Sequence, residues 1–344
     1  MTIAPVSGDT LVADIGGTNA RFAIATPVGL QKIATLAVAH YDHCGDAIDD
    51  YLRHAGVSES DLSAACFAVA SPVGAGEIRF TNSPWRFTRE SLVDRFGFPQ
   101  LRLINDFEAL ALQVPHCPAN ALQTLRVGGA RPESARVVLG PGTGLGVAGL
   151  VPVANAEGAL RWQAVPGEGG HVAFAPADEF EVELLRYLQT LYGRVSVERI
   201  ASGPGLTDLY RFLCRRDGAS PIDERPEAIA QRALAAADSR SLEAVKRFLA
   251  VVGGFAGDAA LMFGAVGGVY LGGGILPKLL AVVSDSDFFV RFNAKGRYES
   301  WVEQIPIHLI TDDTAALRGA ALALAGHGRG FLSRYSPLSR RPGG

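Results

Sequence analysis

The sequence has no marked excess of charge of either sign. Of its 344 residues, 32 are Lys or Arg and 35 are Asp or Glu, which gives a formal net charge of −3 at pH 7. Proteins that bind nucleic acid normally carry a basic patch, so this balance argues against a nucleic-acid partner. Charged residues make up only 19% of the chain and hydrophobic residues 48%, which excludes global disorder.

Cysteine is also scarce, and no two cysteines form a CxxC pair, so zinc-knuckle and thioredoxin-type motifs are absent. So few cysteines in a long chain favour reduced thiols and a cytoplasmic protein. The first ten residues lack the basic and apolar regions of a signal peptide. The uncharged runs 137–156 and 259–277 are interrupted by Gly and Pro. We therefore expect buried strands and loops there, and no association with a membrane.

Glycine, by contrast, is abundant, with 40 of 344 residues, about 12% against an average of about 7%. These glycines cluster in short loops, where they allow backbone to approach a ligand closely. The length predicts about two domains. We expect a small α/β domain from residues 1–117 plus 311–326, a large α/β domain from 118–310, and a flexible tail at 327–344.

The first glycine cluster lies between two predicted strands, 11–15 and 20–26. A phosphate-binding P-loop or dinucleotide fingerprint leads from a strand into a helix, so neither motif fits this strand-to-strand turn. Backbone N–H groups in such a turn can still form an anion-binding concavity. Asp14 at its edge could hold Mg²⁺ through water. An ordinary hairpin in which Asp14 caps its own turn remains an equal alternative.

A second glycine cluster, Gly140–Gly146, repeats this design between predicted strands 137–139 and 147–151. Two such loops in different domains could hold one polyphosphate between them. The repetition suggests two related halves, although the likeness is short. A flexible surface hairpin remains the alternative interpretation.

Polar residues with possible chemistry lie in two further segments. Asn105 is placed to cap a predicted helix at 106–114, and Asp106 in its first turn should stay ionised and able to accept a proton. Glu168 and His171 lie three residues apart in a glycine-rich loop and could converge on one polar ligand. The lack of Cys or a second His nearby argues against zinc. Each feature alone also fits an ordinary structural role, as an acidic first helical turn or a hydrogen-bonded core histidine.

Two weaker candidates are Glu198, which could bind a sugar or simply be neutralised by Arg199, and Asn82, which by itself indicates a turn. The remaining apolar patterns predict further strands and helices. The strands are expected at 65–70, 101–104, 267–274 and 305–310, and the helices at 45–55, 178–192, 206–215, 226–237 and 241–263, from 277, and from 311 to 325.

Taken in order, seven segments resemble the bacterial glucokinase family, the glucose-specific ATP kinases of the hexokinase/actin ATPase superfamily. They run from about residue 10 to 326 and read LVADIGGTNARFAIA, TNSPW, LINDFEALAL, LGPGTGLGVAGL, PGEGGHVAFAP, SVERIASGPGL and VYLGGGILPK. The resemblance implies an α/β, two-domain actin-like ATPase (ribonuclease H-like) fold. It also implies a cleft between the domains and a last helix that returns to the first domain.

The same resemblance implies that ATP phosphorylates glucose at the 6-hydroxyl, with ATP and Mg²⁺ as cofactors, glucose as substrate and a homodimer as the assembly. Asp106 would be the general base. The implied glucose ligands are Asn82, Asn105, Asp106, Glu168, His171 and Glu198, drawn from both sides of the cleft. The implied nucleotide-binding residues are Asp14 (also the Mg²⁺ residue), Gly16, Gly17, Thr18, Asn19, Gly142, Thr143, Gly144, Gly272, Gly273 and Gly274.

One sequence feature distinguishes this chain from a neighbouring family of sugar kinases. Repressor–ORF–kinase sugar kinases follow the Glu-x-x-His segment with a Cys-rich zinc loop, whereas His171 here leads into VAFAPADEF. This favours the zinc-free glucokinase branch. Two other functions stay open, an actin-like filament ATPase and a sugar-sensing protein without catalysis. The sugar-ligand pattern argues against the first, and the presence of Asp106 against the second.

Overall fold

The computed structural model describes residues 8–73, 76–80, 83–129, 131–155 and 158–325. Asn82 and the predicted tail at 327–344 lie outside these described residues. The chain divides into two compact units. The smaller contains the residues up to Val69, residues 73–104 and the chain from Leu317, and the larger contains residues 70–72 and 105–316. The sequence had assigned 105–117 and 311–316 to the smaller domain, so the division differs from that expectation.

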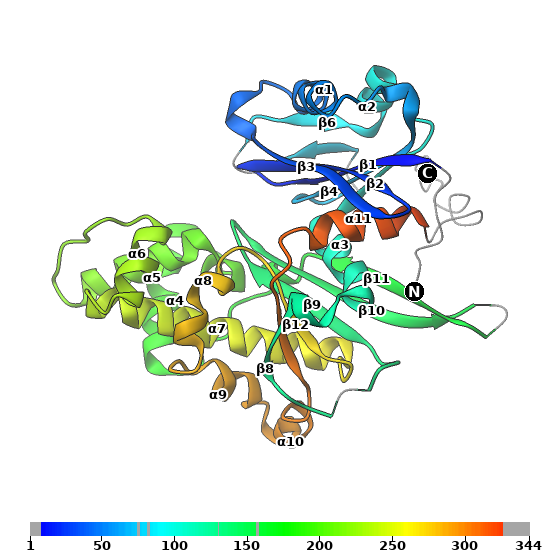
Figure 1. Ribbon diagram of the computed structural model, residues 1–344. Coiled ribbons are helices and arrows are strands. Elements are labelled where there is room, and N and C mark those ends of the chain that lie inside the picture. The colour runs from blue at the N-terminus through cyan, green and yellow to red at the C-terminus, as the bar shows by residue number, and fades with distance from the viewer. Residues whose placement is uncertain (1–7, 74–75, 81–82, 130, 156–157, 326–344) are drawn as a thin grey trace, which may run out of the picture. The chain divides into compact units, whose positions relative to one another are not determined.

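The smaller unit is built on a five-stranded sheet with the order β3-β2-β1-β4-β7. Its strands are β1 (Asp9–Ile15), β2 (Asn19–Thr26), β3 (Gly29–Ala37), β4 (Leu62–Val69) and β7 (Leu101–Asn105). Most residues of the central strands β1 and β4 are buried, because helices cover both faces of the sheet. The helices α1 (Cys44–Ala55) and α2 (Arg89–Phe96) lie on one face and α11 (Ala315–Ala325) on the other (Figure 1).

Two features complete this unit. A short hairpin of β5 (Glu77–Arg79) and β6 (Arg86–Thr88) precedes α2. Helix α11 is tied to β7, because the Nη1 atom of Arg102 donates a hydrogen bond to the carbonyl of Ala323 at 2.7 Å. The last helix therefore returns to the N-terminal unit, as the resemblance implied.

The larger unit is built on a six-stranded sheet with the order β11-β10-β9-β12-β13-β8. The strands are β8 (Leu122–Arg126), β9 (Arg136–Pro141), β10 (Leu145–Ala154), β11 (Leu160–Gly167), β12 (Val269–Leu271) and β13 (Ile307–Ile310). Side chains alternate between the faces of a strand. Val137 and Leu139 therefore face the core beneath α7, while Val138 faces the cluster that contains Phe107 of α3.

The long helix α7 (Ser239–Phe263) covers one face of this sheet and contacts α5 (Gly203–Arg216), α6 (Pro226–Leu234), α8 (Leu276–Val283), α9 (Phe288–Asn293) and α10 (Glu299–Val302). Helix α4 (Glu179–Tyr192) packs against α5, and α3 (Asp106–Gln113) packs against β9, β10 and β11. Glycines let α9 approach α7 closely, because a Cβ on Gly253 would lie 2.1 Å from the carbonyl oxygen of Phe288. Among the helices of the described chain, α7 included, none combines the length and apolar character that a bilayer crossing requires.

The two sheets repeat one topology. In the smaller unit β3, β2 and β1 are antiparallel neighbours and β4 is parallel to β1. In the larger unit β11, β10 and β9 are antiparallel neighbours and β12 is parallel to β9. The glycine turns join corresponding strands, β1 to β2 and β9 to β10. This repetition supports the hypothesis of two related halves.

The predicted elements differ from the observed ones at particular ends. Helix α5 begins at Gly203 rather than Leu206, because the side chain of Ser202 accepts a hydrogen bond from the N–H of Gly205 at 3.1 Å and caps the helix. The expected strand 267–274 is shortened to β12, and its last three glycines form a loop. The last helix begins at Ala315 rather than Thr311, because Asp312 accepts a hydrogen bond from the N–H of Thr314 in a turn.

Candidate active site

The second glycine turn, residues 142–144, joins β9 to β10 in the larger unit. The N–H of Gly142 donates to the carbonyl of Gly144 at 2.8 Å, and the N–H of Gly203 donates to the carbonyl of Gly142 at 2.9 Å. Thr143, at the tip of the turn, is exposed. The turn is therefore anchored to the first residue of α5 while its tip remains accessible.

The glycine loop at 272–274 lies beside this turn. The N–H of Gly272 donates to the carbonyl of Leu139 at 2.8 Å, and a Cβ on Gly140 would lie 2.0 Å from the Gly272 carbonyl oxygen. Gly273 has a φ of +81°, a conformation that favours glycine. Two of the predicted nucleotide-binding segments, distant in sequence, are thus brought together within one unit.

Asn105 and Asp106 open helix α3 of the same unit. The Oδ1 atom of Asn105 accepts hydrogen bonds from the N–H of Phe107 at 2.9 Å and of Glu108 at 3.3 Å. The predicted helix cap is therefore confirmed. Because the cap uses the amide oxygen, the amide nitrogen of Asn105 is the group that could donate to a hydroxyl. Asp106, the first residue of α3, is partly buried and accepts the N–H of Phe107 at 2.9 Å.

Helix α3 packs against β10 through the ring of Phe107. A Cβ on Gly146 would lie 1.8 Å from the Cδ2 atom of Phe107, so only glycine leaves room for this ring. On the next turn of the helix, the Cδ1 atom of Leu110 lies 3.2 Å from where a Cβ on Gly272 would be. The helix that carries Asp106 therefore contacts both glycine segments of the unit.

Glu198 contacts the second glycine turn, and His171 lies beside Glu198. His171 lies in the 3-10 helix Gly169–His171, and Glu198 lies in the 3-10 helix Val197–Arg199. These two helices are joined by a hydrogen bond from the N–H of Val197 to the carbonyl of Val172 at 3.0 Å. The Nε2 atom of His171 lies 3.7 Å from Oε1 of Glu198. Glu168 directly precedes the first of these helices, and its side chain is exposed.

The exposed fractions of this pair fit a binding role. The side chain of His171 is 57% exposed and that of Glu198 is 26% exposed, so both can be reached by a polar ligand. The N–H of Leu145 donates to Oε2 of Glu198 at 2.8 Å, which holds one carboxylate oxygen in place. The backbone of His171 is held by a hydrogen bond from Nη2 of Arg194 to its carbonyl at 2.7 Å.

The first glycine turn belongs to the smaller unit. The N–H of Gly16 donates to the carbonyl of Asn19 at 3.0 Å, and the N–H of Val38 donates to the carbonyl of Thr18 at 2.9 Å. Asp14 precedes this turn and pairs with Arg21 in the β1–β2 register. Burial raises the pKa of the Asp14 carboxyl, and the positive charge of Arg21 opposes this rise. A buried carboxylate of this kind gains from a nearby cation.

The division into two units differs from the one expected for the sugar ligands, whose role in binding stays a prediction. The sugar ligands had been expected from both domains, with Asn105 and Asp106 on one side. In the structure both residues belong to the larger unit, together with Glu168, His171 and Glu198. The physical reason is the contact of Phe107 with Gly146, which fixes α3 to the larger sheet.

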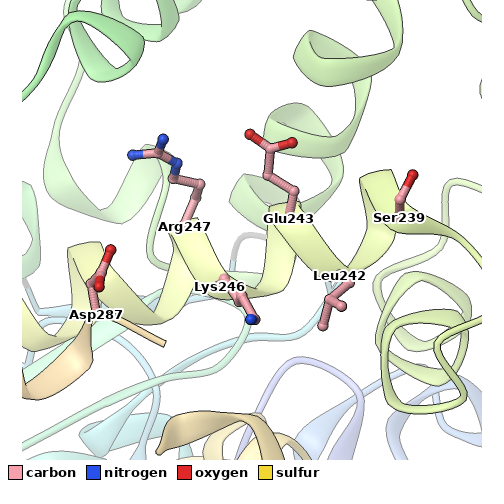
Figure 2. A pocket seen from close by; sticks show the side chains of 6 residues that line it. All are labelled: Ser239, Leu242, Glu243, Lys246, Arg247 and Asp287. Carbon is pink, nitrogen blue, oxygen red and sulfur yellow. The ribbon is translucent and has the colours of Figure 1, made fainter. Parts of the chain in front are cut away.

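A surface pocket of about 300 Å³ lies beside α7, and none of the candidate site residues described above lines it. It is lined by Ser239, Leu242, Glu243, Lys246, Arg247 and Asp287, none of which the sequence had singled out. Figure 2 shows Glu243 and Arg247 pointing to one side of α7 and Leu242 and Lys246 to the other. Arg247 is already engaged by Asp178 at 2.6 Å. The lining is of mixed charge and does not converge on one ligand.

Sequence reasoning missed the contacts that hold the candidate residues in place. Isolated glycines within a strand pattern indicate close approach of another group, so Gly146 offered a signal for the Phe107 contact. No local sequence signal indicated the hydrogen bond from the N–H of Leu145 to Glu198, because it joins residues 53 positions apart.

Comparison with known proteins adds independent information. A family model described as glucokinase matches residues 11–327. A glucokinase of Chromohalobacter salexigens is 46% identical over 316 residues, which cover 91% of this chain and 97% of that protein. Among solved structures, a glucokinase from an Antarctic psychrotroph is 34% identical with a TM-score of 0.78, covering 93% of this chain and 99% of that one.

A more distant structure supports the fold alone. A ROK family glucokinase from Streptomyces griseus, solved with glucose and AMPPNP, is 19% identical with a TM-score of 0.61 and covers 93% of this chain and all of that one. Together with the mixed α/β sheets described above, these similarities confirm the predicted α/β fold class.

Proposed function

The chain belongs to the glucokinase family, and we propose that it transfers the terminal phosphoryl group of ATP to the 6-hydroxyl of glucose. The observation that carries the proposal is that, in the larger unit, the helix of Asp106 contacts both glycine segments, and Glu198 contacts the second glycine turn and lies beside His171. A coupled assay of ADP release over a panel of hexoses tests it. Release that depends on glucose is expected, and release indifferent to any sugar would indicate a filament-type ATPase instead.

Asp106 acts in this proposal as the general base. It orients the 6-hydroxyl and accepts its proton as the new P–O bond forms. Its place at the first position of α3 favours the ionised form, because the N–H of Phe107 donates to its Oδ1 atom and the helix dipole stabilises negative charge there. The cap at Asn105 fixes the start of the helix and so the position of the carboxylate.

The glycine segments supply N–H groups rather than side chains. Phosphoryl transfer is catalysed largely by positioning and by neutralisation of charge. The accessible turn at 142–144 and the loop at 272–274 let the phosphates and the adenosine side of ATP approach the backbone. The first glycine turn, with Gly16, Gly17, Thr18 and Asn19, is also proposed to contact the phosphates.

Asp14 is the residue proposed to hold Mg²⁺, through water. Within the described part of the chain no three His, Cys, Asp or Glu side chains gather as a metal cage. Mg²⁺ usually keeps several waters and needs only one or two carboxylates plus substrate phosphates, so a single buried carboxylate fits it. When bound, Mg²⁺ would neutralise charge on the phosphates.

Replacing Glu168, His171 or Glu198 by Ala should weaken glucose binding more than it lowers kcat. Each replacement leaves a sugar hydroxyl without its partner, which costs about 1–3 kcal/mol. Glucose KM and the preference for glucose over other hexoses would be measured for each variant. Unchanged KM in all three variants would remove these residues from the pocket.

Asp14→Asn should make the ligand-free protein more stable at neutral pH, although it should impair turnover. Because burial raises the pKa of Asp14, the folded protein binds this proton more tightly than the unfolded chain. The free energy of unfolding therefore falls as pH rises from the ordinary value of 3.8 through the raised pKa. Asn carries no such proton, so the stability gained by the variant should grow across this window.

Urea unfolding of wild type and variant, from below pH 3.8 to neutral, would measure this difference. Asp9→Asn is the matched control, because Asp9 begins the same strand in an exposed position. A stability difference for Asp14→Asn that does not change with pH would contradict the expectation.

The homodimer implied by the resemblance and the cytoplasmic location favoured by the scarcity of cysteine remain proposals. Sedimentation equilibrium of the full chain would give its mass in solution, which should be twice the 36.2 kDa of one chain. A mass of one chain at all concentrations would rule out a stable dimer.

A further inference from the structure

The carboxylate of Glu198 is shared between two parts of the candidate site. Its Oε2 atom accepts the N–H of Leu145, the first residue after the second glycine turn, at 2.8 Å. Its Oε1 atom faces Nε2 of His171 at 3.7 Å. One side chain therefore contacts both the turn proposed to bind phosphate and a residue proposed to bind sugar.

The segment that carries Glu198 holds the other end of the same turn as well. Residues 197–203 run from the 3-10 helix into the start of α5, and the N–H of Gly203 donates to the carbonyl of Gly142 at 2.9 Å. The turn is thus held at Gly142 by a backbone bond and at Leu145 by a carboxylate. Within the segment, the N–H of Ala201 donates to the carbonyl of Val197 at 2.8 Å, which limits independent movement of its ends.

Gly144 leaves the space through which this carboxylate reaches the turn. A Cβ at Gly144 would lie 2.6 Å from Oε2 and 3.2 Å from Cδ of Glu198. Its nearest neighbours within 4 Å are all atoms of this carboxyl group. Gly144 does not have a positive φ, so a side chain there would conflict with Glu198 rather than with its own backbone conformation.

We propose that Glu198 is a positioning residue that couples the two substrates, holding the second glycine turn through Leu145 while its other oxygen takes part in sugar binding beside His171. This inference rests on the proposed function. A sugar that fixes the carboxylate also fixes the turn, so glucose and the nucleotide should each raise the affinity for the other by the same factor. Couplings of this kind are typically about 5- to 150-fold.

The test is a set of variants in the full chain, with the dissociation constant of glucose measured by calorimetry with and without AMPPNP. Gly144→Ala should weaken glucose binding by about tenfold in the absence of nucleotide, because the new Cβ displaces the Glu198 carboxylate from its place. It should also reduce the coupling to AMPPNP. Gly129→Ala is the matched control, because Gly129 lies outside the proposed site and a Cβ there would come no closer than 4.0 Å to its nearest neighbour, the Oε1 atom of Gln304.

The effect of Gly144→Ala should depend on Glu198. In a Glu198→Ala background, Gly144→Ala should weaken glucose binding no further, because the carboxylate it would displace is gone. Glu198→Gln retains an oxygen that can accept from Leu145, so this variant should keep more of the coupling than Glu198→Ala. Thermal unfolding of each variant would establish that it is folded.

Two outcomes are distinguishable. If wild type binds glucose but Gly144→Ala weakens it equally in both backgrounds, or not at all, the role of Glu198 proposed here is overturned while the proposed function stands. If wild type does not bind glucose with or without AMPPNP, the proposed function fails and this inference fails with it.

Discussion

Asp106→Asn is expected to lower kcat by about 10²–10⁴-fold, the usual effect of losing a general base. Asn has nearly the same size as Asp but cannot accept the proton of the sugar hydroxyl. The protein should remain folded, because Asn is tolerated at a helix N-terminus and the cap is provided by Asn105. Glucose affinity should change much less than kcat, since the other proposed ligands are intact.

Steady-state kinetics and a glucose titration of the same preparation would separate these effects. Glu108→Gln is the matched control, because it removes one negative charge from the same first helical turn. It should change kcat far less than Asp106→Asn does. If folded Asp106→Asn retains more than about a tenth of wild-type kcat, against the loss expected for a general base, Asp106 is not the base.

Glu181→Gln is expected to reduce the free energy of unfolding by about 3–5 kcal/mol, the cost of leaving a buried charge without its partner. Glu181 of α4 has a side chain that is 1% exposed and forms a two-pronged ion pair with Arg291 of α9, whose side chain is 18% exposed. The Nη2 atom of Arg291 lies 3.2 Å from Oε2 of Glu181, and Nη1 contacts Oε1. Gln supplies only one acceptor and no charge.

The matched control is Glu224→Gln, which breaks the ion pair with Arg211. These side chains are 34% and 44% exposed, and exposed pairs contribute only about 0.2–1 kcal/mol. Urea unfolding would compare the two variants. Replacing both Glu181 and Arg291 by Leu should restore part of the loss, because no buried charge then remains. Equal effects of Glu181→Gln and Glu224→Gln would contradict this account.

The sequence predicted those parts of the fold whose cause is local. Apolar runs on both sides of a glycine turn indicated β1 with β2 and β9 with β10, and the cap residue Asn105 marked the start of α3. The sequence did not predict the parts of the fold that depend on contacts between distant residues. Strand β11 has a largely exposed sequence and is defined by pairing with β10. The division at Asn105 rather than 117 follows from the seating of Phe107 on Gly146, which no local pattern reveals.

The candidate site divides in the same way. Asp106, Glu168, His171 and Glu198 were candidates from local sequence features, and the resemblance to the glucokinase family gave them their proposed roles. The hydrogen bonds that hold these residues in place were not predicted. The bonds from Leu145 to Glu198 and from Gly203 to Gly142 join distant segments through backbone groups that every residue carries. Local features and family resemblance therefore named the side chains, and only the structure relates them to one another.

The most direct test of the central claim is to incubate the full chain with glucose, ATP and Mg²⁺ and follow the reaction by phosphorus NMR. We expect one glucose 6-phosphate for each ADP formed, and almost no ADP when glucose is omitted. ADP formed at the same rate without glucose, or phosphate found at a position other than the 6-hydroxyl, would contradict the account.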